Sequence, residues 1–311
     1  MAQKKHNKRK KTDKKNPIHY LYVSLVLVAV LFGWSGIWHF FENKSDRILP
    51  LAENIWKGCK DESERNGTDD KAEVSTVQGM GGLELPARLT DKPEIILSRE
   101  AYTSSYNTET LCPNYVAWHL TAERVEGNAV RKNNFHGDAD IPEKYRVETS
   151  DYSRSGYDRG HMCPAGDCKS SDEVMSESFL MTNMCPQGHN LNAGDWKELE
   201  DQCREWASSY GEVFVVCGPI FDSARPKTIG KRKGYKISVP DRFFKVVLMM
   251  GRVPKAIGFI YPNDDTNLDI RDYAVSVDDV ERMTGIDFYP ALPDDIESRI
   301  EAECNPGAWG I

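Results

Sequence analysis

The sequence has none of the patterns that mark common zinc sites. It contains no His-Glu-x-x-His motif, which would place two zinc-binding imidazoles on one face of a helix. The spacings of its eight cysteines also match no standard zinc site. These absences argue against a zinc peptidase. They leave zinc bound by Cys163 and Cys168, or by Cys185 and Cys203, only as an alternative use of those thiols.

Beyond residue 18 the chain also lacks the positive charge that nucleic-acid-binding proteins usually carry. This part has 32 Lys and Arg against 47 Asp and Glu, a formal net charge of −15. One dense basic cluster stands out within it: Arg225, Lys227, Lys231, Arg232, Lys233 and Lys236. The cluster could bind phosphates, but a solvated hairpin with ordinary surface lysines explains it equally well.

The N-terminus combines a basic segment with an uncharged one. Residues 1–18 carry eight Lys and Arg and one acid, and residues 19–41 contain no Lys, Arg, Asp or Glu. The apolar stretch 20–38 would be just long enough as a helix, at ~1.5 Å per residue, to span the bilayer core. Trp34 and Trp38 fit an interfacial aromatic belt. We therefore expect a basic cytoplasmic tail over 1–18 and a transmembrane signal anchor over 19–41.

Other interpretations of this segment stay open. It could be a signal peptide cleaved near Gly33, Ser35 and Gly36, which would release a secreted protein. It could also be a buried core helix, and the basic run could bind nucleic acid instead of setting the topology. With an uncleaved anchor, the chain is a single-pass membrane protein whose N-terminus is cytoplasmic. Its main domain is then extracytoplasmic, either periplasmic or extracellular.

All the cysteines lie beyond the expected span. They are Cys59, Cys112, Cys163, Cys168, Cys185, Cys203, Cys217 and Cys304. On an oxidising side of a membrane this even number predicts disulfide bonds. Eight cysteines permit 105 complete pairings, so the sequence does not predict which ones form.

The rest of the chain divides into three parts. Residues 42–85 are polar, mixed in charge and end in a glycine-rich run, which predicts a linker or stalk. Residues 86–293 are expected to form the globular domain, and 294–311 a C-terminal tail. Apolar, β-branched runs predict strands at 116–120, 213–217, 235–239, 243–250 and 256–261. Lys245 and Arg252 interrupt these runs, as in antiparallel strands with one solvent-facing side.

Two helices are expected beside these strands. Residues 191–210 place five large side chains on one stripe at intervals of three and four: Trp196, Leu199, Cys203, Trp206 and Tyr210. Glu200 and Arg204 fall together on one flank of that stripe. A second helix spans 278–284, with Ser276 as cap and Gly285 as its stop. Without regular βαβ alternation, the fold class is α+β, with a mixed, mostly antiparallel central sheet and flanking helices.

The residues with most chemical potential lie between 158 and 192. The segments Asp158-Arg159-Gly160-His161 and Asn183-Met184-Cys185-Pro186-Gln187 are followed by Asn192. An imidazole titrates near neutrality, so His161 could take a proton from water. Arg159 could hold phosphate oxygens bidentately. The neutral oxygen of Asn192 suits Mg²⁺, which keeps several waters and takes one or two protein oxygens.

These segments, in this order and spacing, resemble the DNA/RNA non-specific endonucleases, a family with a ββα-metal finger active site that includes mitochondrial endonuclease G. The resemblance covers residues 86–293 and ends in a closing segment at 284–289. It implies that His161 is the general base and that Asn183 supports the His161 region. It also implies that Asn192 is the only direct protein ligand of Mg²⁺, with Mn²⁺ as a substitute. The other residues with implied roles are Arg159 and Arg204 for phosphate, and Glu200 for binding the ion through water. Arg131 matches an upstream arginine of the family and is a further candidate catalytic residue.

Some features depart from that pattern or lie outside it. Cys163, Cys168 and Cys185 sit in or beside the signature segments. Asn192 and Glu200 are eight residues apart, ~12 Å along a straight helix, so both can serve one ion only if the helix bends or begins after Asn192. His119 is expected to be structural; His189 and His136 have no established role.

The resemblance therefore implies a Mg²⁺-dependent endonuclease that hydrolyses DNA and RNA without sequence preference and leaves 5′-phosphate ends. The alternative is a catalytically silent, extracytoplasmic nucleic-acid-binding module on the same scaffold. DNA and RNA are the expected partners, with the membrane bound through the anchor. The oligomeric state is not determined by the sequence, and a homodimer is compatible with it.

Overall fold

The computed structural model describes residues 82–232, 234–264 and 267–311. The expected cytoplasmic tail, the anchor, Cys59 and nearly all of the stalk lie outside these residues. Among the helices that are described, none is both long enough and apolar enough to cross a bilayer.

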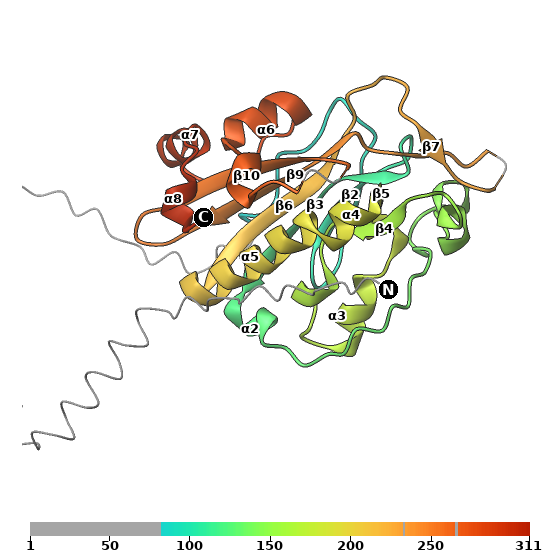
Figure 1. Cartoon of the computed structure of the whole chain (residues 1–311), viewed down its shortest axis with the longest axis horizontal. Coiled ribbons are helices and arrows are strands. Elements are labelled where there is room, and N and C mark those ends of the chain that lie inside the picture. The colour runs from blue at the N-terminus through green and yellow to red at the C-terminus, as the bar shows by residue number, and fades with distance from the viewer. Residues whose placement is uncertain (1–81, 233, 265–266) are drawn as a thin grey trace, which may run out of the picture. The chain divides into compact units, whose positions relative to one another are not determined.

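A seven-stranded sheet forms the centre of the domain (Figure 1). Its order is β1-β2-β3-β6-β9-β10-β11, and every neighbouring pair is antiparallel. The strands are β1 Ile95–Ser98, β2 Thr103–Asn107, β3 Cys112–Thr121, β6 Glu212–Ile220, β9 Arg242–Met249, β10 Lys255–Pro262 and β11 Ala274–Val275. The prediction of an α+β fold around an antiparallel sheet is confirmed, although β1 and β2 were not expected.

Helices cover both faces of this sheet. Alternate residues of β6 enter two separate cores: Val213 and Val215 face one, and Phe214 and Val216 face the other. The expectation that the strands have a solvent-facing side is therefore wrong. The clearest sign is Lys245 of β9, which is 0% exposed.

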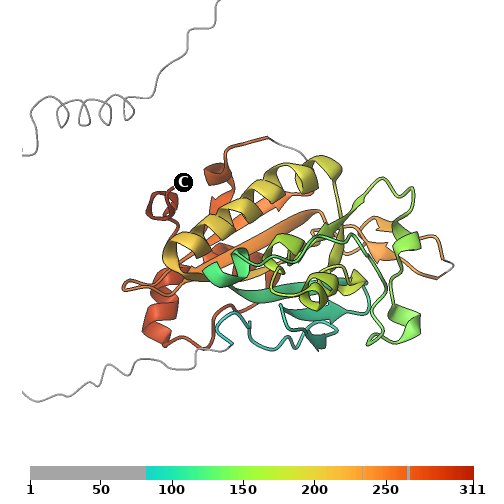
Figure 2. The same ribbon diagram turned by 90° about the horizontal axis from the view of Figure 1, so that it is seen from below.

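The first layer of helices contains α4 His189–Ala193 and α5 Asp195–Tyr210, and the opposite layer contains α6 Val277–Thr284 and α7 Asp294–Glu301 (Figure 2). The predicted stripe of α5 is buried from Trp196 to Trp206, but its last predicted member, Tyr210, is 42% exposed. Each large buried apolar side chain contributes about 1.5–3 kcal/mol of burial free energy. Helix α6 begins and ends as predicted, because the Ser276 hydroxyl accepts from Asp279 N and Gly285 adopts φ 69°.

The predicted single helix over 191–210 is two helices. Gly194 separates α4 from α5 with φ −110° and ψ −110°. A Cβ atom at this position would lie 2.6 Å from the carbonyl oxygen of Asn190. Glycine thus permits a sharp change of direction that another residue would obstruct.

A small antiparallel hairpin stands beside the main sheet and leads into α4. It pairs β4 Asp158–His161 with β5 Met184–Gln187. Gly160 fits here because a Cβ would lie 2.6 Å from the Cβ of Gln187. Hairpin and helix together make the expected ββα unit.

The remaining elements are short. They are α2 Ala122–Val125, α3 Asp172–Glu177, α8 Pro306–Trp309, β7 Thr228–Ile229, β8 Ile237–Ser238, and the 3-10 helices η1 Glu143–Tyr145, η2 Thr149–Tyr152, η3 Ala165–Asp167, η4 Met181–Asn183 and η5 Ile270–Tyr273. The expected strand at 235–239 is reduced to β8. The segment 294–311 folds onto the domain as α7 and α8, with Ile300 and Trp309 buried.

The expected disulfide bonds do not occur among the described cysteines, all seven of which are free thiols. Six of them are buried. Cys163 Sγ and Cys168 Sγ lie 3.6 Å apart, which is a hydrogen-bond distance and not a covalent one.

Candidate active site

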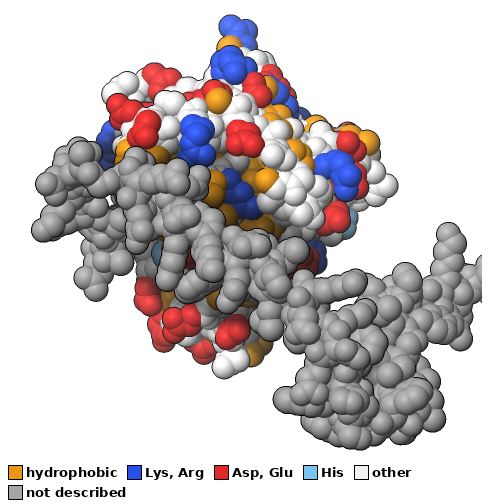
Figure 3. Space-filling view, turned by 90° about the vertical axis from the view of Figure 1, so that its left-hand side faces the viewer, with side chains coloured by type: hydrophobic (Ala, Val, Ile, Leu, Met, Phe, Trp, Pro, Cys, Tyr) orange, Lys and Arg blue, Asp and Glu red, His pale blue; other side chains and the backbone are white. Residues whose placement is uncertain are grey.

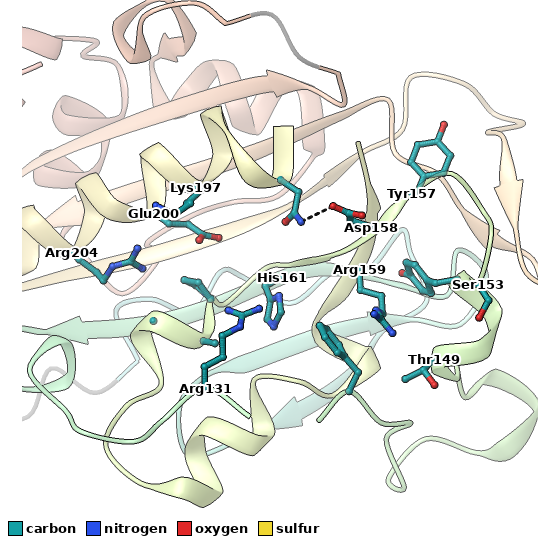
Figure 4. A pocket seen from close by; sticks show the side chains of 16 residues that line it. Arg131, Thr149, Ser153, Tyr157, Asp158, Arg159, His161, Lys197, Glu200 and Arg204 are labelled. Carbon is teal, nitrogen blue, oxygen red and sulfur yellow. Dashed lines mark hydrogen bonds between the residues drawn. The ribbon is translucent and has the colours of Figure 1, made fainter. Parts of the chain in front are cut away.

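A pocket of about 560 Å³ opens between the ββα unit and the segments around it. Its lining includes six of the seven residues proposed from the sequence: Arg131, Arg159, His161, Asn192, Glu200 and Arg204. In Figure 4, Glu200 and Arg204 point from α5 toward the side on which His161 and Arg131 lie. Residues more than 70 positions apart in the chain therefore share one cavity.

His161 ends strand β4 and is almost completely buried. Its ring lies 5.4 Å from that of Phe135 and meets the Phe179 ring edge-on at 5.1 Å. Its Nε2 atom is buried and has no hydrogen-bond partner among the described residues. Burial, together with the positive charges of Arg131 and Arg159, lowers the pKa of His161 from 6.5 to about 3. The imidazole is therefore neutral at physiological pH and able to accept a proton.

Asn183 is the one predicted site residue outside the pocket lining. It is completely buried, and its Oδ1 accepts from Cys163 N at 2.9 Å. Its Nδ2 donates to the carbonyl oxygens of Cys163 and Ser178, both at 2.8 Å. These bonds fix the chain just after His161, which fits a supporting function and not contact with substrate.

Asn192 is held in place by Asp158, the first residue of the signature segment. Asn192 Nδ2 donates to Asp158 Oδ2 at 3.1 Å, which leaves its Oδ1 as the atom able to bind a cation (Figure 4). The same carboxylate oxygen lies 2.8 Å from His189 Nδ1. No separate role for Asp158 could be predicted from the sequence, since spacing alone does not indicate a contact between residues 34 positions apart.

Glu200 and Arg204 reach the pocket from helix α5. Burial raises the pKa of Glu200 to about 7, despite the opposing effect of Lys245 and Arg204. Arg204 donates to Asp167 Oδ1 at 2.8 Å and also to Asp201, so its guanidinium is fixed. Because α5 begins at Asp195, after Asn192, the straight-helix separation of Asn192 and Glu200 does not apply.

Two further arginines lie against aromatic rings near His161. The guanidinium carbon of Arg159 is 4.2 Å from the centre of the Phe135 ring. That of Arg131 is 5.2 Å from the Phe179 ring, and its Nε donates to Asn133 Oδ1 at 2.9 Å. Stacking of this kind orients a guanidinium without neutralising it. The pocket thus keeps positive charge for an anion.

Lys245 lies beneath the site and is completely buried. The sequence pattern had predicted that its side chain faces solvent. Its ammonium group lies 4.3 Å from the Trp196 ring and 5.5 Å from the Trp118 ring, and no hydrogen-bond partner lies among the described residues. Burial opposes its charge, but the neighbouring Cys217 and Cys203, and after them Glu200 and Asp167, raise its pKa above the usual value. A single lysine within an apolar run does not predict that its ammonium group is buried near two tryptophan rings.

The donors in the pocket suit a hard divalent cation. They are the amide oxygen of Asn192 and the carboxylate of Glu200, and the pocket lining contains no cysteine. Carboxylate and amide oxygens are typical ligands of Mg²⁺, and an amide oxygen is a poor ligand of zinc.

The profile of the DNA/RNA non-specific endonuclease family matches residues 86–295, which include every pocket residue described above. The chain belongs to the DNA/RNA non-specific endonuclease family. The resemblance inferred from the signature segments is therefore confirmed.

Individual relatives agree with this assignment. The endonuclease is 36% identical over 230 residues to a nuclease of Nostoc sp., a match that covers 70% of this chain and 81% of the relative. It is 35% identical over 230 residues to the mitochondrial nuclease of Saccharomyces cerevisiae, covering 67% and 69% of the two chains. A solved structure of an EndoG/EndoGI complex aligns with a TM-score of 0.60 and 30% identity, over 65% of this chain and 89% of that one.

Proposed function

We propose that the endonuclease hydrolyses DNA and RNA without sequence preference, depends on Mg²⁺, and leaves 5′-phosphate ends. One observation carries this proposal. A neutral, buried imidazole shares a pocket with three arginines and two oxygen donors for a hard cation. A module that only binds nucleic acid would not need a buried imidazole whose Nε2 has no hydrogen-bond partner among the described residues.

His161 would act as general base. Its Nε2 would accept a proton from the attacking water, a step for which geometry matters first and pKa second. A base with a pKa near 3 is weak. A bound phosphate would offset the positive charges of Arg131 and Arg159, so the pKa of His161 would rise in the substrate complex.

The arginines would bind the phosphate oxygens from more than one side. Arg159 and Arg131 lie near His161, and Arg204 approaches from α5 (Figure 4). Asp167 and the phenyl rings hold these guanidiniums before substrate arrives, which reduces the ordering needed on binding. Asn192 and Glu200 would hold Mg²⁺, which when bound stabilises negative charge on the phosphate and on the departing 3′ oxygen.

The basic cluster of 225–236 divides into two kinds of residue. Arg232 is committed to the fold, because it pairs with the fully buried carboxylate of Asp151 and donates to Arg146 O at 2.6 Å. Lys227 donates to the hydroxyl of Tyr157, a residue of the pocket lining, at 3.1 Å. Lys227 is therefore the member best placed to contact a strand that leaves the pocket.

The surface of the described domain carries charges of both signs. On the visible part of the face in Figure 3, basic side chains stand beside acidic ones, with a group of acidic side chains at its lower edge. The net charge of −15 beyond residue 18 is thus compatible with local binding of phosphates. We further propose that residues 19–41 tether the endonuclease to a membrane, with its domain extracytoplasmic.

Cleavage of plasmid DNA and of RNA by the purified full-length protein tests the proposal. Mg²⁺ should support cleavage, Mn²⁺ should substitute, and EDTA should stop it. His161→Ala should lower the rate by about 10²–10⁴, as for a lost general base. End-labelling of the products should find 5′-phosphates.

The matched control is His119→Ala, since His119 lies outside the pocket and pairs with Glu212 at 2.7 Å. This variant should cleave at the wild-type rate. Full activity in His161→Ala would contradict the assigned base. Retention of nucleic acid without cleavage, in Mg²⁺, Mn²⁺ and Ca²⁺ alike, would favour the silent binding module.

A further inference from the structure

A group of carboxylates lies in the helix layer on the opposite side of the sheet from the active site. Asp278 and Glu281 come from α6, and Glu301 is the last residue of α7. One oxygen of each lies within 4.8 Å of the others. The helices that carry them contact β10 and each other, whereas the active-site pocket is built on α4 and α5.

Glu301 is the unusual member of the group. It is only 6% exposed, and its Oε1 is buried without a hydrogen-bond partner among the described residues. A buried carboxylate oxygen without a donor costs free energy unless a proton or a cation satisfies it. Asp278 and Glu281 are half-buried, so the group can be reached from solvent.

The local charge is negative and uncompensated. None of the three residues forms an ion pair with a lysine or arginine in the part of the chain that the structure describes, and the nearby Arg282 is paired with Asp279. Glu281 accepts only the backbone N–H of Phe288, at 2.8 Å. Burial, then the charges of Glu281, Glu297, Asp278 and Asp287, raise the pKa of Glu301 to about 9.

We propose that Asp278, Glu281 and Glu301 form a structural site for a calcium-like divalent cation, separate from the catalytic one. Ca²⁺ takes oxygen ligands at 2.3–2.6 Å, so two ligands of one ion can be up to about 5 Å apart. The 4.8 Å limit meets this condition without rearrangement. Mg²⁺ retains its waters more strongly and is rarely enclosed by protein oxygens alone, so it fits a group of three carboxylates less well.

The bound cation would connect α6 to the C-terminal end of α7. Both helices cover the same sheet face, and Val280 and Ile300 are buried in the same core. The site would therefore act on stability and not on cleavage. A proton on Glu301 would satisfy the buried oxygen without a cation. Glu301→Gln distinguishes these two states, because glutamine mimics the protonated acid but binds cations poorly.

The test uses the full-length protein with Asn192→Ala, which removes the direct ligand of the catalytic site. After EDTA treatment and dialysis at pH 7.5, CaCl₂ should raise the melting temperature by roughly 5–10 °C at a hundredfold excess over its Kd. Native mass spectrometry should find one Ca²⁺ per chain. Adding Glu301→Gln should abolish both responses, and adding Asp278→Asn should weaken them.

Glu303→Gln is the matched control, because Glu303 is an exposed acid just after α7 and outside the group. It should leave the Ca²⁺ response unchanged. Equal Ca²⁺ responses with and without Glu301→Gln would overturn the site. So would a parent protein that shows no Ca²⁺ response. If Glu301→Gln then matches or exceeds the metal-free stability of that parent, a proton occupies the position. None of these readouts depends on nuclease activity.

Discussion

At the scale of single residues, the pocket depends on a histidine that is kept neutral by its surroundings. Phe135 and Phe179 exclude water from the ring, and Arg131 and Arg159 disfavour a second positive charge. A base of this kind is available at every physiological pH. The arrangement also has a cost for the fold in acid.

That cost gives a pH-dependent prediction. In the unfolded chain His161 should bind a proton near pH 6.5, but in the fold only near pH 3, so its stabilising contribution is present above pH 6.5 and lost as pH falls. Between pH 7 and 4.5 the loss is about 2–3 kcal/mol. His161→Ala should lose that much less stability than wild type over this range in urea unfolding. Parallel losses in the two proteins would contradict the shift.

Asp158 gives a second prediction at this scale. Its carboxylate accepts from Asn192 Nδ2 and so leaves Oδ1 of Asn192 free for the proposed cation. Asp158→Ala should raise the Mg²⁺ concentration for half-maximal cleavage about 10–100-fold, as loss of such a support usually does. Asp140→Ala, an exposed acid paired with Arg99, is the control. An unchanged Mg²⁺ dependence would rule out this positioning function.

Sequence reasoning was strongest for residues in the signature segments and just after them. Arg159, His161 and Asn192 could be named because each side chain has chemistry that the proposed reaction requires, and the structure brings them to one pocket. Asp167 and Lys245 could not be named. Their importance comes from contacts with Arg204, Trp118 and Trp196 that form only when distant segments fold together.

At the scale of elements, the break between α4 and α5 controls where Asn192 and Glu200 point. The hydrophobic stripe of 196–206 predicted α5 well, because a spacing of three and four specifies one buried face. The stripe could not show that the helix begins only at Asp195. That depends on the backbone of one glycine.

Gly194→Ala tests this break. The added methyl group would meet the carbonyl oxygen of Asn190 at 2.6 Å, so α4 must shift relative to α5. Such overpacking should cost about 1–3 kcal/mol of stability. Cleavage should fall further, by up to about 10²-fold, since a displacement near 1 Å misaligns Asn192. Gly156→Ala, where nothing lies within 4 Å of a Cβ, reports on backbone strain alone. Wild-type cleavage in Gly194→Ala would contradict this explanation.

At the scale of the whole molecule, two helix layers enclose one sheet, and the chain closes the fold at its C-terminal end. Trp309 is 2% exposed, lies 4.7 Å from the Trp206 ring and accepts the indole N–H of Trp206 at its carbonyl oxygen. Lys255 lies over the Trp309 ring at 4.4 Å. The last residues therefore complete the core around α5.

Trp309→Ala should consequently destabilise the fold by about 3–5 kcal/mol in urea unfolding, the usual range for a buried tryptophan. Leu268→Ala, at a side chain that is 51% exposed, should have little effect. At temperatures where Trp309→Ala remains folded, its cleavage rate should match wild type, because Trp309 is outside the pocket. A free energy of unfolding equal to that of wild type would show that the packing of Trp309 in α8 does not contribute to stability.

The fold class could be predicted from the number and order of apolar runs. The burial of both sheet faces could not, because Lys245 was interpreted as a solvent-facing residue. A strand pattern reports which residue types alternate. It does not show that two tryptophans and two carboxylates will lie near one particular residue, Lys245, in the folded chain.

The burial of the Lys245 ammonium group affects how the protein responds to ionic strength. Dissolved ions screen charges at the surface but hardly reach a side chain that is 0% exposed. Its attraction to Glu200 and Asp167 should thus persist in concentrated salt, while contacts between exposed guanidiniums and a polyanion weaken. Added salt should therefore weaken the binding of nucleic acid more than it slows the cleavage of nucleic acid that is already bound. KM, and not kcat, would then depend on the salt concentration.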